Sequence, residues 1–191
     1  MLWVDDPANE AQIMWMFGPA GAGKSAIAQS IAEMCFEQEK LVASFFFSRN
    51  ASGRNNETRF ISTLVYQLVL AISEIQDSVN KALEDDRLLF SRSLHVQAQK
   101  LIIKPLNDLL LTSNSENGFQ NTRPRLIIVD GLDECGKVKN QRHVLDVLIP
   151  SIVLRCQPAR ANHTRLFQQR VDVLKHHSPC SGRHLRKQRR H

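Results

Sequence analysis

Short apolar runs separated by longer amphipathic stretches form the pattern of this 191-residue chain. Three runs stand out, at residues 13–17 (IMWMF), 41–47 (LVASFFF) and 126–129 (LIIV). Continuous runs of this length are typical of parallel strands that are buried on both faces. The first run ends at a glycine and the third at Asp130. We therefore predict three buried strands, with Phe45, Phe46 and Phe47 serving core packing rather than ligand stacking.

Helical periodicity fills the stretches between these runs. From Ser25, apolar residues recur at intervals of three and four as far as Cys35. Thr58 is the predicted N-cap of a second helix. The apolar face of that helix is expected to consist of Phe60, Ile61, Leu64, Val65, Leu68 and Val69. Strands that alternate with helices predict a three-layer α/β fold around a parallel sheet. The helices are expected at residues 25–40, 58–73, 74–83, 94–111 and 141–149, with an Asn-, Ser- and Gly-rich loop at 112–124.

A glycine-rich motif lies between the first predicted strand and the first predicted helix. It matches G-x-x-x-x-G-K-[ST] at every fixed position, and such backbones surround phosphate oxygens with N–H groups. The helix that follows adds the positive end of its dipole. Lys24 is expected to bind the β- and γ-phosphates, and the Ser25 hydroxyl is expected to bind Mg²⁺. A glycine-rich turn without a ligand is the alternative, which the flanking strand and helix disfavour. The predicted phosphate-binding residues are Gly18, Pro19, Ala20, Gly21, Ala22, Gly23, Lys24 and Ser25.

Acidic residues follow the third apolar run, in the sequence Asp130-Gly131-Leu132-Asp133-Glu134. A carboxylate at the end of a buried strand lies at the carboxyl edge of the sheet, where ligands bind in α/β folds. Asp130 is therefore the predicted magnesium-side carboxylate, with a simple strand-end cap as the alternative. Asp133 and Glu134 could each orient or deprotonate an attacking water. Glu134 is the preferred base, and the choice between the two stays open.

Charge and cysteine content narrow the class of protein. Ten of the 25 Lys and Arg residues lie in 155–191 against one acid, so the preceding 154 residues carry 15 basic and 18 acidic groups. A nucleic-acid-binding face on the core is therefore not expected. The four cysteines form no CxxC pair, and no leader-like start or run of about 18 apolar residues is present. We expect a cytoplasmic protein without a membrane segment.

Together, the segments GPAGAGKSAIAQSIAE, LVASFFFSR, RNN at 54–56 and RLIIVDGLDEC closely resemble the NACHT-type (STAND) P-loop NTPase domain of fungal NOD-like receptors. The nephrocystin-type N-terminal domain is the nearest version. The resemblance covers roughly residues 3–155. It implies binding of ATP or GTP, slow hydrolysis, and a nucleotide-governed switch between a closed monomer and a signalling oligomer. With the motifs described above, the predicted catalytic residues are Glu134, Asp133 and Lys24, and the predicted cofactor is Mg²⁺.

The chain departs from that family after the last predicted helix. Family members continue into a strand that ends in a sensor arginine, whereas the nearest stretch here is 152–158, with Gln157 in the arginine's place. We therefore expect a truncated member with a sheet incomplete at the sensor strand. The predicted organisation is a lead-in at 1–12, an NTPase core at 13–156 and a disordered basic tail at 157–191.

Two other functions stay open from the sequence. The first is an interaction module that keeps the fold and has lost turnover, which the missing sensor arginine favours. The second is nucleic-acid binding through the basic tail, which a steep salt dependence of binding would reveal.

Overall fold

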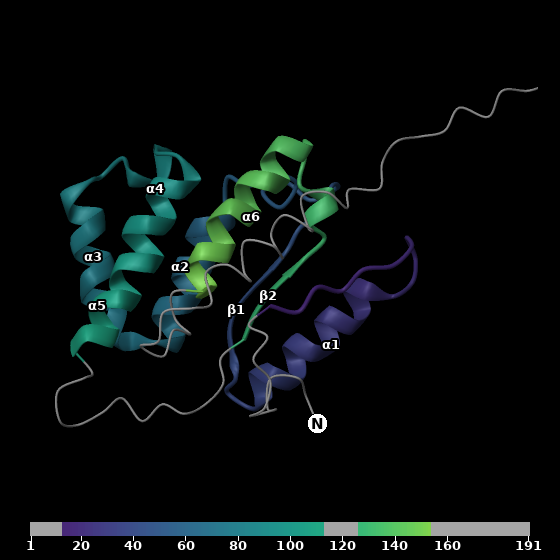
Figure 1. Cartoon of the computed structure of the whole chain (residues 1–191), viewed down its shortest axis with the longest axis horizontal. Coiled ribbons are helices and arrows are strands. Elements are labelled where there is room, and N and C mark those ends of the chain that lie inside the picture. The colour runs from purple at the N-terminus through teal and green to yellow at the C-terminus, as the bar shows by residue number, and fades with distance from the viewer. Residues whose placement is uncertain (1–12, 113–125, 154–191) are drawn as a thin grey trace, which may run out of the picture. The chain divides into compact units, whose positions relative to one another are not determined.

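The computed structural model describes residues 13–112 and 126–153, all of which lie within the unit Met1–Cys156. The predicted lead-in at 1–12 and the predicted tail at 157–191 lie outside the described residues. Figure 1 shows the elements in their order along the chain. They are α1 (Lys24–Glu37), β1 (Leu41–Phe46), α2 (Phe60–Ala71), η2 (Ser73–Ile75), α3 (Gln76–Asp85), η3 (Leu89–Ser91), α4 (Leu94–Ala98), η4 (Gln99–Ile103), α5 (Lys104–Thr112), β2 (Leu126–Asp130), η5 (Leu132–Glu134) and α6 (Val138–Val153).

The two strands form a parallel sheet, although 79 residues separate them in sequence. Phe46 stands opposite Asp130, and the ladder continues one step further through a 2.9 Å hydrogen bond from Phe47 N to Asp130 O. Helix α1 contacts both strands, α2 contacts β1, and these two helices lie on different sides of the strands in Figure 1. The prediction of a mixed helix and strand fold with a parallel sheet is confirmed.

The prediction of a first strand at 13–17 is wrong. This segment pairs with no strand within the described residues, and the sheet there has two strands. Its side chains are largely exposed, with Trp15 at 49% and Phe17 at 85%. A run of five apolar residues forms a strand only where a neighbouring strand offers its backbone and a helix covers its side chains. The edge of β2 that no described strand occupies offers such a backbone, but residues 13–17 do not pair with it.

The outer edge of β1 is closed by a side chain. The Gln67 amide donates to Ser44 O and accepts from Ser44 N, each at 2.9 Å. One amide therefore satisfies the two backbone groups that an additional strand would otherwise bind at this position. Within residues 13–112 and 126–153 the sheet has no strand beyond β1, and the other edge of β2 is likewise occupied by no described strand.

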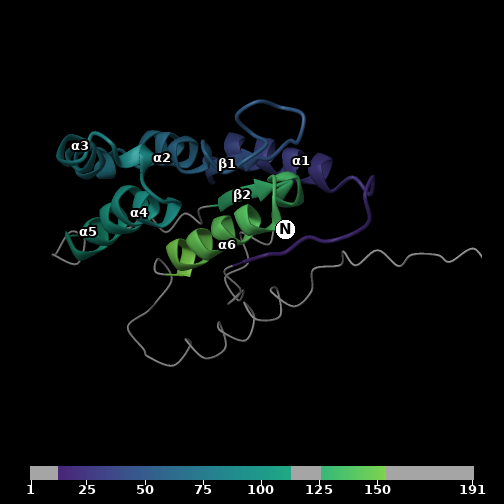
Figure 2. The same ribbon diagram turned by 90° about the horizontal axis from the view of Figure 1, so that it is seen from above.

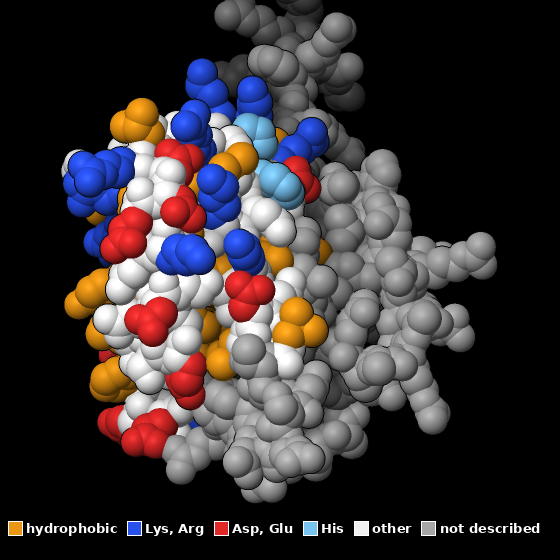
Figure 3. Space-filling model, turned by 90° about the vertical axis from the view of Figure 1, so that its left-hand side faces the viewer, with side chains coloured by type: hydrophobic (Ala, Val, Ile, Leu, Met, Phe, Trp, Pro, Cys, Tyr) orange, Lys and Arg blue, Asp and Glu red, His pale blue; other side chains and the backbone are white. Residues whose placement is uncertain are grey.

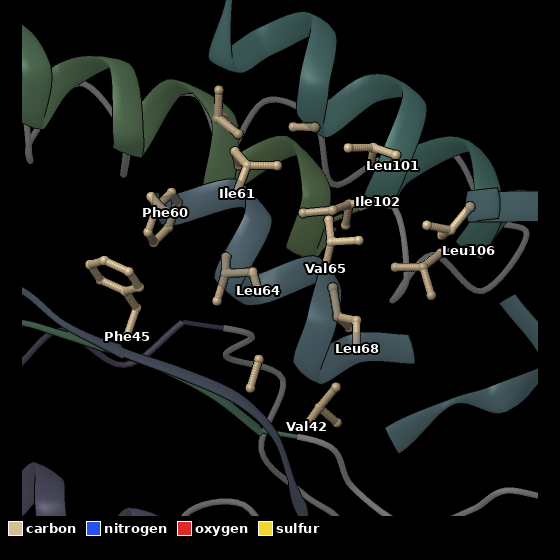
Figure 4. Packing of buried hydrophobic residues seen from close by; sticks show 14 of the residues in the cluster. Val42, Phe45, Phe60, Ile61, Leu64, Val65, Leu68, Leu101, Ile102 and Leu106 are labelled. Atoms are coloured by element: carbon tan, nitrogen blue, oxygen red, sulfur yellow. The ribbon is translucent and has the colours of Figure 1, made fainter. Parts of the chain in front are cut away.

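The core lies where α2 packs on β1. Figure 4 shows Val42 and Phe45 of β1 pointing toward α2, with Leu101, Ile102 and Leu106 beyond it. Phe45 and Phe47 are buried, which confirms their predicted role in packing. The predicted apolar face of α2 is also confirmed. Val69 is partly buried, and the other five of its six side chains are buried: Phe60, Ile61, Leu64, Val65 and Leu68.

Thr58 does not cap α2, so that prediction is wrong. The helix begins at Phe60, with Arg59 at the cap position and no side-chain cap. Thr58 N instead donates to Asn56 Oδ1 at 2.9 Å. This turn is one that asparagine favours, and it holds the backbone before the helix in another conformation.

The predicted helix at 94–111 is one helical stretch in three parts, α4, η4 and α5. Its middle part, η4, has π-helical geometry and ends two residues before Pro105, which is the second residue of α5. Proline has no N–H to donate and its ring crowds the preceding turn. The wider π turn is therefore a local adjustment that lets the helix continue past the ring.

The predicted helix at 141–149 is confirmed and is longer than expected. Helix α6 runs from Val138 to Val153 and so continues past position 150. Residues 152 and 153, the first two of the stretch nearest to a sensor strand, are helical, and 154–158 lie outside the described residues. The first two residues of that stretch are therefore not part of a strand.

One face of the molecule, at the side of α3, α4 and α5, carries acidic and basic side chains interspersed with apolar ones (Figure 3). Among the helices that the structure describes, none is long and apolar enough to cross a membrane.

Candidate functional site

The glycine-rich segment adopts a left-handed backbone at two positions before α1 begins. Gly21 has a φ of 78° and Gly23 a φ of 81°, values that other residues adopt only with strain. A Cβ atom built at either glycine meets nothing within 4 Å. Glycine is therefore required there by the backbone conformation, while the space beside the loop is open.

Lys24, the first residue of α1, folds back across this loop. Its Nζ donates to Gly18 O and to Pro19 O, each at 2.9 Å. The ammonium group is thus held over the segment that precedes the helix. An anion bound there would accept from the same ammonium group in place of one or both carbonyl oxygens.

The start of α1 has no compensating negative charge of its own. Its first turn contains no acidic residue, and Gly23 supplies no side-chain cap. The N–H groups of Lys24, Ser25 and Ala26 have no acceptor within the helix, as at any helix start. The positive end of the helix dipole and these donors form the kind of surface that binds phosphate.

The end of β2 is fixed by a close backbone approach. Asp130 is the last strand residue, and Gly131 follows it with a φ of 67°. A Cβ atom at Gly131 would stand 2.7 Å from Phe47 O, a distance that side chains do not tolerate. Glycine at this position therefore lets the chain turn immediately after Asp130 and carry the acidic residues over the end of β1.

Asp133 and Glu134 differ in their surroundings. Asp133 is exposed, and its backbone carbonyl accepts a 3.3 Å hydrogen bond from Gln141 Nε2. Glu134 is half-buried, and its Oε2 accepts a 2.8 Å hydrogen bond from Arg49 N. The Glu134 carboxylate therefore has a fixed position, which favours it over Asp133 for a role that requires accurate placement.

The two motifs lie toward the same end of the sheet. Three residues, 38–40, connect α1 to β1, and the two elements are in contact, so they run in opposite directions. The 14 residues of α1 span about 21 Å and the six of β1 about 20 Å. The start of α1 is therefore level with the end of the strands, as Figures 1 and 2 show.

No hydrogen bond or ion pair joins the glycine loop to Asp130, Asp133 or Glu134 within the described residues. The same residues contain no group of three His, Cys, Asp or Glu side chains placed to hold a metal ion. Magnesium at phosphate sites takes only one or two protein ligands, the remainder being waters and phosphate oxygens. Ser25 and Asp130 are consistent with that kind of site.

Thiol chemistry at this edge is disfavoured. Cys135 follows Glu134 directly and is completely buried. Burial, with a smaller contribution from the negative charge of Glu57, raises the pKa of the Cys135 thiol to about 11. The thiol stays protonated at neutral pH, and only the thiolate is a nucleophile.

Arg49 is the residue at this edge whose contact the sequence reasoning did not identify. It appeared there only as part of the LVASFFFSR segment. Its hydrogen bond to Glu134 joins residues 85 positions apart, and an exposed arginine after a strand gives no periodic signal.

Comparison with known proteins supports one part of the resemblance described above. A family model described as nephrocystin 3, N-terminal, matches residues 1–166. No curated protein and no solved structure matches the chain.

Proposed function

Because the chain belongs to the nephrocystin 3 N-terminal family, we propose that it binds ATP or GTP together with Mg²⁺ at residues 18–25. The single observation that carries this proposal is the conformation of the glycine loop. Two left-handed glycines lead into an uncapped helix start, and Lys24 is held across the loop. This combination of N–H donors, helix dipole and ammonium group suits a polyphosphate.

The roles of the remaining residues follow from their positions. Ser25, in the first turn of α1, and Asp130, at the end of β2, would hold Mg²⁺, directly or through water. The metal ion would neutralise charge on the phosphate oxygens. Glu134 accepts the proton of an attacking water, since its carboxylate is half-buried and anchored. Slow hydrolysis would make the protein a nucleotide switch of the kind found in NOD-like receptor signalling, with self-association through this domain.

A second candidate is an interaction module that binds nucleotide without turnover. The unpaired segment at 13–17 favours it, because the strand before the loop would normally hold the loop rigid. Comparing equilibrium binding with single-turnover hydrolysis distinguishes the two candidates.

Substituting Lys24→Ala is expected to weaken triphosphate binding at least about tenfold, equivalent to about 1.4 kcal/mol. The substitution removes the ammonium group that lies over the loop. Titration of the full chain with a fluorescent ATP or GTP analogue measures the effect. Lys104→Ala is a matched control, because Lys104 is the exposed first residue of another helix, α5. Equal affinity of the folded Lys24→Ala variant and the control would refute the proposed site.

Two acidic substitutions are expected to have different effects. Asp130→Asn removes charge from the metal side, so Mg²⁺ should no longer strengthen triphosphate binding. Glu134→Gln keeps an oxygen that can accept from Arg49 N, so binding should persist while turnover falls. Binding with and without Mg²⁺, and single-turnover hydrolysis, are the measurements. An equal loss of binding in both variants would contradict this division of roles.

A further inference from the structure

The segment that follows β1 places an arginine at the carboxyl edge of the sheet. Arg49 stands three residues after Phe46, the last residue of the strand. Its backbone N–H is bound to the Glu134 carboxylate at 2.8 Å, so its main chain is held beside the proposed base. The start of α1 is level with the end of β1. The hydrogen bond of Arg49 therefore lies at the same end of the sheet as the glycine loop.

The segment is ordered by its own backbone. Ser48 N donates to Arg54 O at 3.0 Å, and Arg54 N donates to Ala51 O at 3.0 Å. Further along, Asn55 O lies 3.6 Å from the position that a Cβ at Gly136 would take. The loop after β1 is therefore hydrogen-bonded to the loop after β2 through Arg49 and Glu134 and passes close to it at Asn55, and the backbone of Arg49 has a fixed position.

The guanidinium group of Arg49 has no hydrogen-bond or ion-pair partner among the residues that the structure describes, and the residue is exposed. Arg59, by contrast, lies close over Gly53, where a built Cβ would meet its Cδ at 3.0 Å. Arg54 is exposed, but its backbone serves the internal turn rather than the contact with Glu134. Arg49 is thus the arginine of this loop that combines an anchored backbone with an uncommitted guanidinium group.

A guanidinium group binds phosphate through two parallel N–H donors, with more directional selectivity than an ammonium group. We propose that Arg49 contacts the terminal phosphate of a triphosphate bound at residues 18–25, and so distinguishes nucleoside triphosphates from diphosphates. This inference rests on the proposed function. Lys24 binds phosphate from the side of the helix, and Arg49 approaches from the end of β1 and reports whether the third phosphate is present. The β1–α2 loop would therefore contact the nucleotide when a triphosphate is bound and not when a diphosphate is bound.

The test compares triphosphate with diphosphate affinity. The magnesium complexes of ATP, ADP, GTP and GDP are titrated into the wild-type full chain and into Arg49→Ala, Arg49→Lys and Arg54→Ala. Arg49→Ala should lower triphosphate affinity about tenfold and leave diphosphate affinity unchanged, since one charge-assisted contact is lost. Arg49→Lys should restore part of the difference, and Arg54→Ala should match the wild type.

Other results would distinguish a failure of the proposed Arg49 role from a failure of the proposed nucleotide site. If triphosphate binding depends on Lys24 and is unchanged in Arg49→Ala, the role of Arg49 is overturned and the nucleotide site stands. If Arg49→Ala weakens both nucleotides equally, or lowers the melting temperature as well, the residue is structural and the inference fails. Absence of nucleotide binding by the wild type would overturn the proposed function and the inference together.

Discussion

Replacing Phe60 with alanine is expected to lower the free energy of unfolding by about 3–5 kcal/mol. The side chain is completely buried at the start of α2. Its ring lies 5.2 Å from that of Phe45 in an edge-to-face arrangement and 5.7 Å from that of Phe47 in a stacked one. Removing the ring leaves a cavity between α2 and β1, and the rigid sheet cannot collapse into it. Urea unfolding of the full chain measures the change.

Phe36→Ala provides the comparison, because Phe36 lies on α1 with 73% of its surface exposed. Its loss should change stability by no more than about 0.5 kcal/mol. If Phe60→Ala is too unstable to purify, Phe60→Leu keeps most of the volume and should cost less than about 1.5 kcal/mol. Similar effects of Phe36→Ala and Phe60→Ala would show that the aromatic contact of α2 with β1 is not a centre of the core.

Gly131→Ala is expected to lower the free energy of unfolding by about 2–4 kcal/mol and to weaken the proposed magnesium-dependent nucleotide binding. The left-handed backbone accounts for about 1–2 kcal/mol of this. The remainder comes from the new Cβ, which would stand 2.7 Å from the backbone oxygen of Phe47 and must push the two strand ends apart. That movement also displaces Asp130, which precedes the glycine. Thermal unfolding and nucleotide titration measure the two effects.

Gly136→Ala is the control that separates the cost of the backbone conformation from the cost of the steric collision. Gly136 is also left-handed, with a φ of 48°, but its nearest neighbour would be the movable Asn140 side chain at 3.3 Å. It should therefore show the cost of the backbone conformation without the collision with Phe47. An equal loss of stability in the two variants would mean that the close approach of the strand ends has no energetic weight.

The sequence predicted those elements whose signal is local. A regular spacing of apolar residues within one short segment predicts an element without any knowledge of distant residues. Such spacing predicted the apolar face of α2, the strand that ends at Asp130 and the helix after the glycine loop. The run at 13–17 failed because a strand depends on a partner, and hydrophobicity alone does not show whether one is present. Ile27 shows the same limit, because it belongs to the helical spacing that follows Ser25 and yet 48% of its surface is exposed.

The candidate site also contains residues that a local pattern predicted and a contact that no local pattern could predict. The motif indicated the glycine loop and Asp130, since a fixed spacing of small and charged residues specifies that backbone. The anchoring of Glu134 by Arg49 depends on how two loops meet in space, which no pattern within either loop reveals. Thr58 was a good cap by residue type, and the Asn56 turn displaced it.

The amide of Gln67 also limits how copies of this protein could assemble through their sheets. Because this side chain occupies the backbone groups of Ser44, a further strand beside β1 could not form its hydrogen bonds in the middle of that edge. Two copies that paired through β2 would use the one remaining edge of each described sheet. A fibre needs two open edges in every unit, so assembly by strand addition would end with that pair.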